Sequence, residues 1–206
     1  MSDSGHVEIQ PLLEAMRRRR VTRNFLHKPV PIAEIRDVLR AARWASSAGN
    51  RRIHRFLVLR NPETIIRLKP FAPGILGQPP ALIVLMTDFE KARAENVQID
   101  RDVNCWIDVG TAMMSMMLAA DAVGLGSCPA TSFSQSAVAR VLTLPAYLRP
   151  ELILQLGWPA PAPAVTGRRR SGPTAFDLTD WEQIGQREPD DVAEADARLS
   201  LAQTER

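Results

Sequence analysis

The sequence predicts a single domain of the α+β or α/β class, built from short buried strands and amphipathic helices. Three apolar runs have the length of strands and are bounded by turn-forming residues, at 56–59, 81–86 and 152–156. Between the second and third runs, residues 106–123 are apolar on nearly every side, which predicts a buried helix. At 206 residues and 45% hydrophobic content, the chain can bury one sizeable core but is short for two domains. We expect residues 1–185 to form that domain, and the polar residues 186–206 to be a peripheral helix or a disordered tail.

Two helices are predicted before the first strand. Apolar side chains recur at helical spacing near the N-terminus, at Ile9, Leu12, Leu13 and Met16. The arginine run 17–20 therefore lies at or just past a helix C-terminus, where the helix dipole favours cations. Pro31 suits a first helical position, and the helix that follows has an apolar face made by Ile35, Val38, Leu39 and Ala42. This second helix is expected to end at 48–50, and the strand 56–59 is expected to stop at 61–62.

The middle of the chain is dominated by the apolar helix. The strand 81–86 precedes a polar stretch, 89–104, that is expected on the surface. The helix 106–123 must be covered on all sides, either as the central helix of the domain or by the same helix of a second subunit, and we favour a dimer. Glycines in the segment 124–126 end this helix, and Ser134 is placed to cap a short helix before the last strand.

The composition argues against several classes of function. The formal net charge is only +3, and the few aromatic residues are not interleaved with the basic runs, so nucleic-acid binding is not expected. No stretch reaches the roughly 20 apolar residues that a membrane span needs, and no signal-peptide pattern is present, so we expect a cytoplasmic protein without membrane contacts. Cys105, Cys128 and the three scattered histidines lack the spacing of a metal site, which leaves metal catalysis without support.

Two clusters of arginines suggest a bound anion. The first comprises Arg19, Arg20 and Arg23, and the second, 168–170, follows the apolar run 152–157. The planar guanidinium matches phosphate oxygens bidentately and stays charged when it is desolvated, which suits a cofactor phosphate. Basic runs of this length are also typical of solvated surfaces and of nucleic-acid patches. The clusters alone do not decide between these interpretations.

In order and spacing, a series of motifs resembles the FMN-dependent nitroreductase family over roughly residues 12–173. The motifs are Arg19-Arg20-Val21-Thr22-Arg23-Asn24-Phe25, Pro29-Val30-Pro31 with the helix through Ala48-Gly49-Asn50, Asp108-Val109-Gly110-Thr111-Ala112, Gly124-Leu125-Gly126 with the residues through Phe133, and Leu156-Gly157-Trp158-Pro159. The resemblance implies a three-layer α-β-α fold of the α+β class, with a mixed central sheet and a buried central helix. It also implies a homodimer with two FMN sites at the subunit interface.

The resemblance assigns FMN binding to four segments of this chain. The residues are Arg19, Arg20, Val21 and Arg23, then Ser46, Ser47, Ala48 and Asn50, then Pro129, Ala130, Thr131 and Ser132, and finally Arg168, Arg169 and Arg170. In the family, the arginines hold the flavin phosphate, the ribityl chain and the pyrimidine edge. The segment 46–50 reaches the flavin across the dimer interface, and a backbone amide within 129–132 points at flavin N5.

Several positions depart from the family pattern. Val21 replaces a serine, Ser46 replaces a proline, and Thr131 and Ser132 replace an acidic or glycine residue, although a backbone donor survives that exchange. The sharpest departure is Arg52-Ile53-His54, where relatives usually have Gln-Pro-Trp. This change reflects either drift at a packing position or altered handling of the substrate or nicotinamide.

The resemblance implies an oxidoreductase that passes hydride from NAD(P)H to FMN N5 and then to a nitroaromatic, quinone or similar acceptor by a ping-pong mechanism. No side chain is assigned a catalytic role, because the cofactor carries the chemistry. Asp108 is interpreted as an early-turn helix charge, and Cys128 as packing. The segment 71–104 is expected to set the substrate range. The alternatives are a specialised relative, such as a flavin-destroying dimethylbenzimidazole synthase, and a non-enzymatic flavin-binding protein.

Overall fold

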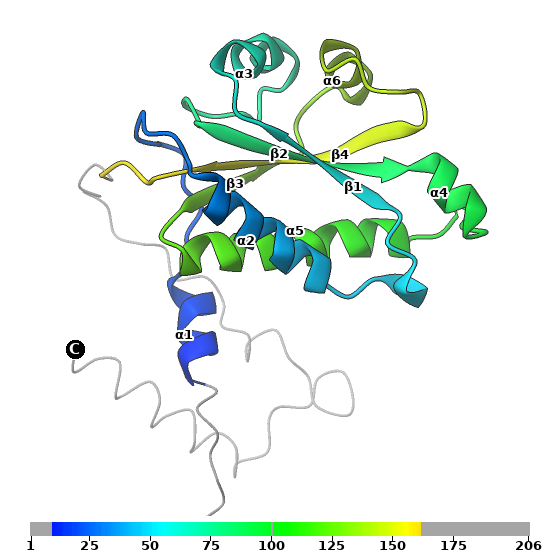
Figure 1. The fold of residues 1–206 in the computed structure, drawn as a ribbon, viewed down its shortest axis with the longest axis horizontal. Coiled ribbons are helices and arrows are strands. Elements are labelled where there is room, and N and C mark those ends of the chain that lie inside the picture. The colour runs from blue at the N-terminus through cyan, green and yellow to red at the C-terminus, as the bar shows by residue number, and fades with distance from the viewer. Residues whose placement is uncertain (1–9, 100, 162–206) are drawn as a thin grey trace, which may run out of the picture. The chain divides into compact units, whose positions relative to one another are not determined.

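A computed structural model describes residues 10–99 and 101–161 of the chain. The predicted domain limit at 185, the tail 186–206 and the cluster Arg168–Arg170 lie outside these described residues. The order of elements agrees with the predicted α+β class, because helices alternate with strands that pair antiparallel (Figure 1).

The sheet has four strands in the order β1-β2-β4-β3. They are β1 (His54–Leu59), β2 (Ala81–Asp88), β3 (Gly126–Ala130) and β4 (Leu148–Gly157). Every residue of β2 is buried, as are the last eight of β4, so the two central strands form the middle of the core. All neighbouring strands pair antiparallel, and the parallel component expected of a mixed sheet is confined to an isolated bridge between Val21 and Ser127. Strands β2 and β3 do run in the same direction, but β4 lies between them.

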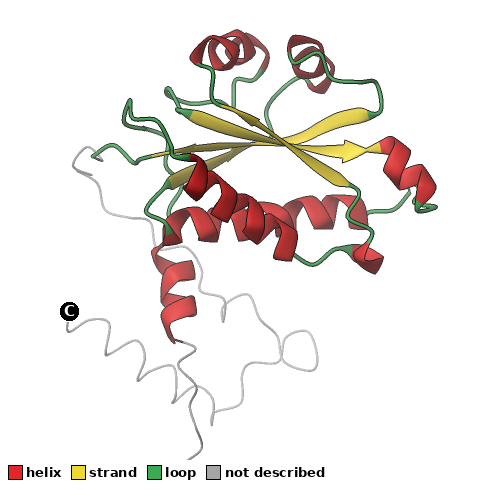
Figure 2. Cartoon of the chain, viewed as in Figure 1, coloured by secondary structure: helices red, strands yellow, loops and turns green. Residues whose placement is uncertain are grey.

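Helices cover both faces of the sheet, which confirms the predicted three layers (Figure 2). Helices α2 (Ile32–Trp44) and α5 (Asn104–Ala122) cover one face, and α3 (Pro62–Leu68) and α6 (Gln135–Val141) cover the other. The side chains of β2 alternate between the two cores. Ala81, Ile83 and Leu85 pack toward α2 and α5, while Leu82, Val84 and Met86 pack toward α3 and α6.

Two α-helices and one strand of the described residues were not predicted, and each has a physical explanation. The pair Asn61-Pro62 was interpreted only as the stop of β1, but it also starts α3, because the Asn61 side chain accepts hydrogen bonds from the backbone of Glu63 and Thr64. Helix α4 (Phe89–Ala94) lies in the stretch interpreted as polar surface, and Asp88 caps it by accepting from Lys91 N. Strand β3 has the composition of a turn and becomes a strand only through its pairing with β4.

Helix α2 has the predicted apolar face, with one correction at its end, whereas Leu12, Leu13 and Met16 of α1 (Gln10–Arg18) are exposed in the single chain. Helix α1 ends in the arginine run, as expected. Helix α2 ends at Trp44 rather than at 48–50, because the backbone of Ala45 and Ser47 is extended. Residues Ala48–Asn50 form a separate 3-10 turn in which Gly49 has a φ of 60°. This break makes 46–50 a loop that stands away from α2.

Helix α5 is buried on one side and open on the other within the single chain. Its covered side packs on α2 and the sheet through residues such as Val109, Ala112 and Met116. Val103, Ile107 and Met114 are 66%, 56% and 43% exposed. They lie on one face of the helix, and a Cβ built on Gly110 would meet no atom within 4 Å. We call Val103, Ile107, Gly110 and Met114 the open stripe of α5.

Candidate functional site

The segment after α1 is fixed to the ends of β3 and β4. The backbone of Thr22 donates to Ser127 O at 2.9 Å, and Leu26 N donates to Trp158 O at 2.9 Å. Gly126 has no room for a Cβ, because the Thr22 side chain occupies that space. Backbone pairing at Ser127 therefore brings the predicted site segment 19–23 to the edge strand that leads into the predicted segment 129–132.

A pocket of about 190 Å³ lies at this edge, between the arginine run, the C-terminal end of α5 and β3. Its lining includes Arg18, Arg19 and Arg20 together with Ser127. Arg18 pairs with Asp121 at 3.0 Å, and Arg20 Nη1 donates to the carbonyl of Arg19 at 2.9 Å. Arg19 Nη1 is buried and has no hydrogen-bond partner among the described residues. A buried charged donor is costly to leave unpaired, so this atom is the unusual feature of the pocket.

The segment 129–132 leads away from the same edge and is held by a buried glutamine. Gly74 N donates to Ser132 O at 3.0 Å, and the Ala130 side chain fills the space beside Gly74. Gln155, fully buried in β4, donates from Nε2 to the carbonyls of Gly74 and Cys128 and accepts from Leu76 N at 2.8 Å. We did not predict this role. The signal was a lone amide inside the apolar run 152–156, since such a group is buried only where it finds partners.

The third described segment, 46–50, is anchored at the opposite end of α5. Ala48 N donates to the Asp108 carboxylate, at 3.1 and 3.3 Å to its two oxygens. Thr111 Oγ1 donates to Ser46 O at 3.1 Å. The buried Asp108 carboxylate thus joins helix α5 to the loop 46–50. This role is more specific than that of a charge in the early turns of a helix, which the sequence predicted.

These two anchors show that one chain does not bring all predicted site segments together. Arg18 contacts α5 at Asp121, whereas Ala48 contacts it at Asp108. With a rise of about 1.5 Å per residue, the two aspartates are about 20 Å apart along the helix. Figure 1 shows α1 beside one end of α5 and the turn that follows α2 beside the other.

A cavity of about 370 Å³ lies next to the 46–50 loop, between α2, α5 and β1. We call it the His54 cavity. Its walls are mainly apolar and include Leu39, Ala42, Ala45, Phe56 and Ala112, and the other lining residues are Arg43, Ser46, Ser47, Arg52, His54 and Asp108. Ser47 Oγ is buried and has no hydrogen-bond partner among the described residues. The ring nitrogens of His54 are buried as well. Burial lowers the pKa of His54, and the charges of Asp108 and Glu151, together with backbone hydrogen bonds to Met86 and Cys105, oppose this only in part.

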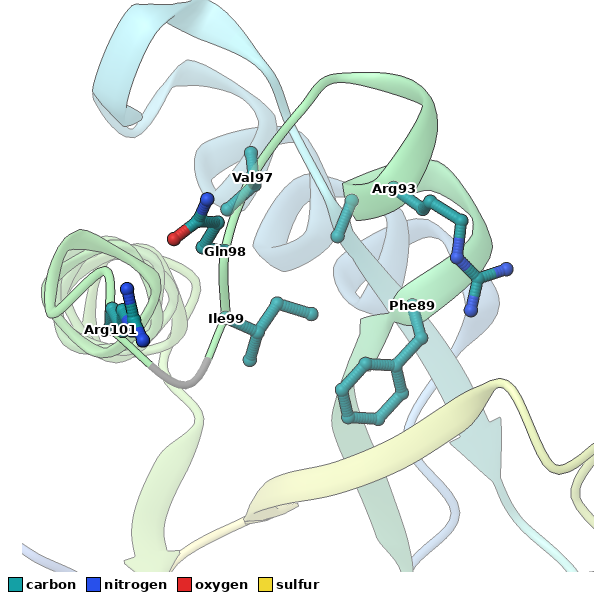
Figure 3. Close-up of a pocket in the computed structure, with 7 residues that line it drawn as sticks. Phe89, Arg93, Val97, Gln98, Ile99 and Arg101 are labelled. Carbon is teal, nitrogen blue, oxygen red and sulfur yellow. The ribbon is translucent and has the colours of Figure 1, made fainter.

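A further pocket of about 360 Å³ lies over α4 and the residues that follow it (Figure 3). Phe89, Val97 and Ile99 form apolar walls, and Arg93 and Arg101 stand at its sides. Beside it, the Arg149 guanidinium lies 4.9 Å from the centre of the Phe89 ring and 5.2 Å from that of Trp106. The pocket belongs to the segment 71–104 that is expected to set the substrate range.

Both cysteines are buried and free of disulfides. Burial raises the pKa of the Cys105 and Cys128 thiols, and the charge of Arg23 opposes this shift only weakly at Cys128. Within residues 10–99 and 101–161, no group of three or more His, Cys, Asp or Glu is placed to hold a metal ion. In the same residues, no helix has both the length and the apolar character needed to cross a membrane.

Comparison with known proteins identifies the family. The family model described as "Nitroreductase family" matches residues 16–76 and 70–158. The chain belongs to the nitroreductase family. This nitroreductase-family chain is 26% identical over 185 residues to a Methanothermobacter thermautotrophicus protein described as an NADH dehydrogenase or NAD(P)H nitroreductase, which covers 86% of this chain and 91% of that protein. It is 29% identical over 182 residues to a protein named NADH dehydrogenase from Thermus thermophilus, which covers 73% of this chain and 89% of that one.

Solved structures of the family share the fold. A nitroreductase family protein from Clostridium difficile superposes with a TM-score of 0.70 at 26% identity, covering 84% of this chain and 98% of that one. The structure of NfrA1 from B. megaterium superposes with a TM-score of 0.68 at 21% identity, covering 90% of this chain and 78% of that one. The likeness to NfrA1, at 21% identity, concerns the fold alone. The match to the Clostridium difficile protein extends over almost the whole of that chain.

Proposed function

We propose that this nitroreductase-family chain is a cytoplasmic homodimeric oxidoreductase that uses FMN to pass a hydride from NAD(P)H to a nitroaromatic, quinone or similar acceptor by a ping-pong mechanism. An NAD(P)H-dependent oxidoreductase activity follows from its relatives. The single observation that carries the choice of a phosphate-bearing cofactor is the buried, unpartnered Nη1 of Arg19 in a pocket lined by further arginines.

The donors present fit a flavin phosphate. Three consecutive arginines and residues of β3 line the pocket, and within residues 10–99 and 101–161 only Arg18 of the three is paired with a carboxylate. Arg19 and Arg20 would bind the phosphate, with Arg23 at the same segment and Arg168–Arg170 added from outside the described residues. Bound FMN would supply the hydride carrier, at its N5 atom. Residues Pro129–Ser132, fixed by Gln155 and Gly74, would orient the flavin ring through their backbone.

The positions of the site segments support a dimer. The loop 46–50 and the arginine pocket lie at opposite ends of α5, so a single chain cannot place both on one cofactor. A two-fold axis across the open stripe of α5 would set two such helices antiparallel, and each loop would then approach the arginine pocket of the partner. The same contact would cover Val103, Ile107 and Met114, which are exposed in one chain.

The proposal is tested by the absorption spectrum of the purified protein, followed by anaerobic addition of NADH and then NADPH. Flavin bands that bleach with a nucleotide and return when 4-nitrobenzamide or a quinone is added are the expected result. A protein that stays colourless after reconstitution with FMN would contradict the assignment. Flavin that only dithionite reduces would favour the non-enzymatic binding protein, and loss of the flavin during turnover would favour the flavin-destroying relative.

A further inference from the structure

The His54 cavity carries chemistry that flavin binding does not use. Both nitrogens of the imidazole are buried, and the backbone of Met86 and Cys105 interacts with them, so they do not depend on a ligand. The cavity itself, at about 370 Å³, is large enough for a small ligand. Relatives usually have tryptophan at this position, and a tryptophan side chain would take up part of the same space.

The walls of the cavity suit a flat apolar body. Phe56 from β1 faces Leu39 and Ala42 from α2 and Ala112 from α5 across the cavity. These side chains offer no hydrogen bonds, so the body of a ligand would be held by packing and by the burial of apolar surface. A volume of about 370 Å³ is enough for a single aromatic ring with substituents.

Two cations line the cavity, and neither is paired with a carboxylate among the described residues. Arg43 comes from the last turn of α2, and Arg52 comes from the loop before β1. Arg52 is bonded only through Nε, which donates to Asn50 Oδ1 at 2.8 Å. The Asp108 carboxylate also lines the cavity; it accepts from Ala48 N and forms no ion pair with Arg43 or Arg52 among the described residues. The guanidinium groups are therefore available for an anionic group.

The backbone holds Arg52 in an unusual conformation. Gly49, Asn50 and Arg52 all have positive φ, at 60°, 55° and 49°. For a long side chain such as Arg52, this conformation costs about 1 kcal/mol or more, and such strain concentrates at binding sites. The strained backbone of the loop thus places the Arg52 side chain at the cavity.

From these features we propose that the His54 cavity binds a planar aromatic carboxylate, with the acid group on Arg43 and Arg52 and the ring packed against the apolar walls beside His54. Because Ser46 and Ser47 line the cavity and also belong to the loop proposed to contact flavin, the cavity would select acidic aromatic acceptors; this role rests on the proposed function. The replacement of Gln-Pro-Trp by Arg52-Ile53-His54 is then a change of specificity rather than drift.

The test compares two probes of the same shape, 4-nitrobenzoate and the neutral 4-nitrobenzamide. Binding to the full chain is measured by calorimetry with and without FMN, and kcat/KM for each probe is measured with NAD(P)H. The wild-type protein should bind the acid at least about tenfold tighter than the amide. Arg43→Gln and Arg52→Gln should each weaken binding of the acid about fivefold or more and change binding of the amide less than about twofold.

Two further variants locate the effect. His54→Trp should abolish binding of both probes by filling the cavity, and retained FMN absorption and thermal unfolding would verify its fold. Arg36→Gln is the matched control, since Arg36 lies on the same face of α2 two turns from Arg43 but does not line the cavity. It should change binding of the acid less than about twofold.

Three outcomes would overturn the inference: equal affinity for acid and amide, unchanged binding in His54→Trp, or an effect of Arg36→Gln as large as that of Arg43→Gln. These outcomes are separable from failure of the proposed function. A chain that takes up no flavin but still binds 4-nitrobenzoate as described contradicts the proposed function alone. A flavin enzyme that shows no preference for the acid contradicts only the inference about the cavity.

Discussion

The two ends of helix α5 present different kinds of site. At the C-terminal end, backbone pairing of Thr22 with Ser127 sets three arginines around a small pocket, and a buried cation lacks a partner. At the N-terminal end, a loop with positive φ angles borders a larger, mainly apolar cavity that is also lined by the His54 imidazole and the buried Asp108 carboxylate. The first end suits a doubly charged phosphate, and the second suits a flat molecule with one charge. Helix α5 therefore separates the arginine pocket from the loop 46–50, and in the proposed dimer the second subunit would bring the two together.

The largest expected effect tests whether the two ends act on one cofactor across subunits. Arg19→Ala damages the arginine end and Ser47→Tyr blocks the loop end, so each homodimer should have little activity. Co-expressed chains should form mixed dimers in which one of two sites is intact, which restores about a quarter of the wild-type activity in a random mixture. The measurement is NAD(P)H oxidation by the mixture and by each parent. No recovery in verified mixed dimers would mean that each site lies within one chain.

The next effect concerns the arginine end alone. Arg19→Ala removes the unpartnered buried donor and should weaken FMN binding roughly ten- to a hundredfold, because hydrogen bonds to charged groups are the strong ones. Quenching of FMN fluorescence on titration measures it. Arg18→Ala is the matched control: this side chain is exposed and pairs with Asp121, so a change of less than about threefold is expected. Similar losses in both variants would indicate a diffuse charge effect instead of a built site.

The backbone contact that creates the arginine end can be broken by a single methyl group. Gly126→Ala should destabilise the protein by about 1–3 kcal/mol, because the new Cβ would overlap the Thr22 side chain. Urea unfolding followed by circular dichroism gives the difference. Gly110→Ala, where a Cβ meets open space in one chain, should be neutral or stabilising by up to about 1 kcal/mol. Clear destabilisation at Gly110 would mean instead that a second subunit already covers the open stripe.

Backbone strain distinguishes the loop end. Arg52→Gly should leave the free energy of unfolding nearly unchanged, because glycine adopts a φ of 49° without the side-chain penalty. Arg51→Gly is the comparison, since Arg51 has an ordinary φ of −70° and pairs with Asp102 at 3.5 Å. It should cost about 1 kcal/mol. Equal losses at the two positions, measured by urea unfolding, would show that Arg52 is not strained.

The smallest expected effect is the pH dependence that His54 adds. Burial lowers its pKa in the folded protein below the value of 6.5 expected when unfolded, so the unfolded chain takes up a proton first. Its contribution to stability is therefore complete above pH 6.5 and is lost as the pH falls through the folded pKa. Between pH 7.5 and 5.5, the wild type should lose more stability than His54→Gln, as measured by urea unfolding at each pH. Parallel losses in both proteins would place the pH dependence elsewhere.

Local patterns in the sequence predicted most of the regular elements. Helical spacing located α1, α2, α5 and α6, and apolar runs of strand length located β1, β2 and β4. Each of these signals comes from residues that are neighbours in the chain. Strand β3 escaped this approach, because Ser127, Cys128 and Pro129 have no strand pattern of their own and are held by pairing with β4.

In the candidate site too, the sequence predicted the local features but not the contacts between distant residues. The sequence pointed to the arginine run and to 129–132 as parts of one site, and the structure brings their neighbourhoods together through Val21, Thr22 and Ser127. It did not predict the bonds of Gln155 or the anchoring of Ala48 by Asp108, since these join residues far apart in the chain. The Arg52-Ile53-His54 change was visible as a departure, but the cavity around it was not.

The sequence by itself determined the periodic elements, the order of the motifs and the supply of cations, because these depend on residue type and spacing. Only the tertiary structure decided that one arginine is buried without a partner, that 46–50 and 19–23 lie at opposite ends of α5, and that His54 faces a cavity. Burial and distance depend on how segments far apart in the chain pack against one another. A side chain loses contact with water because residues from other segments cover it, and a local sequence pattern does not specify those residues.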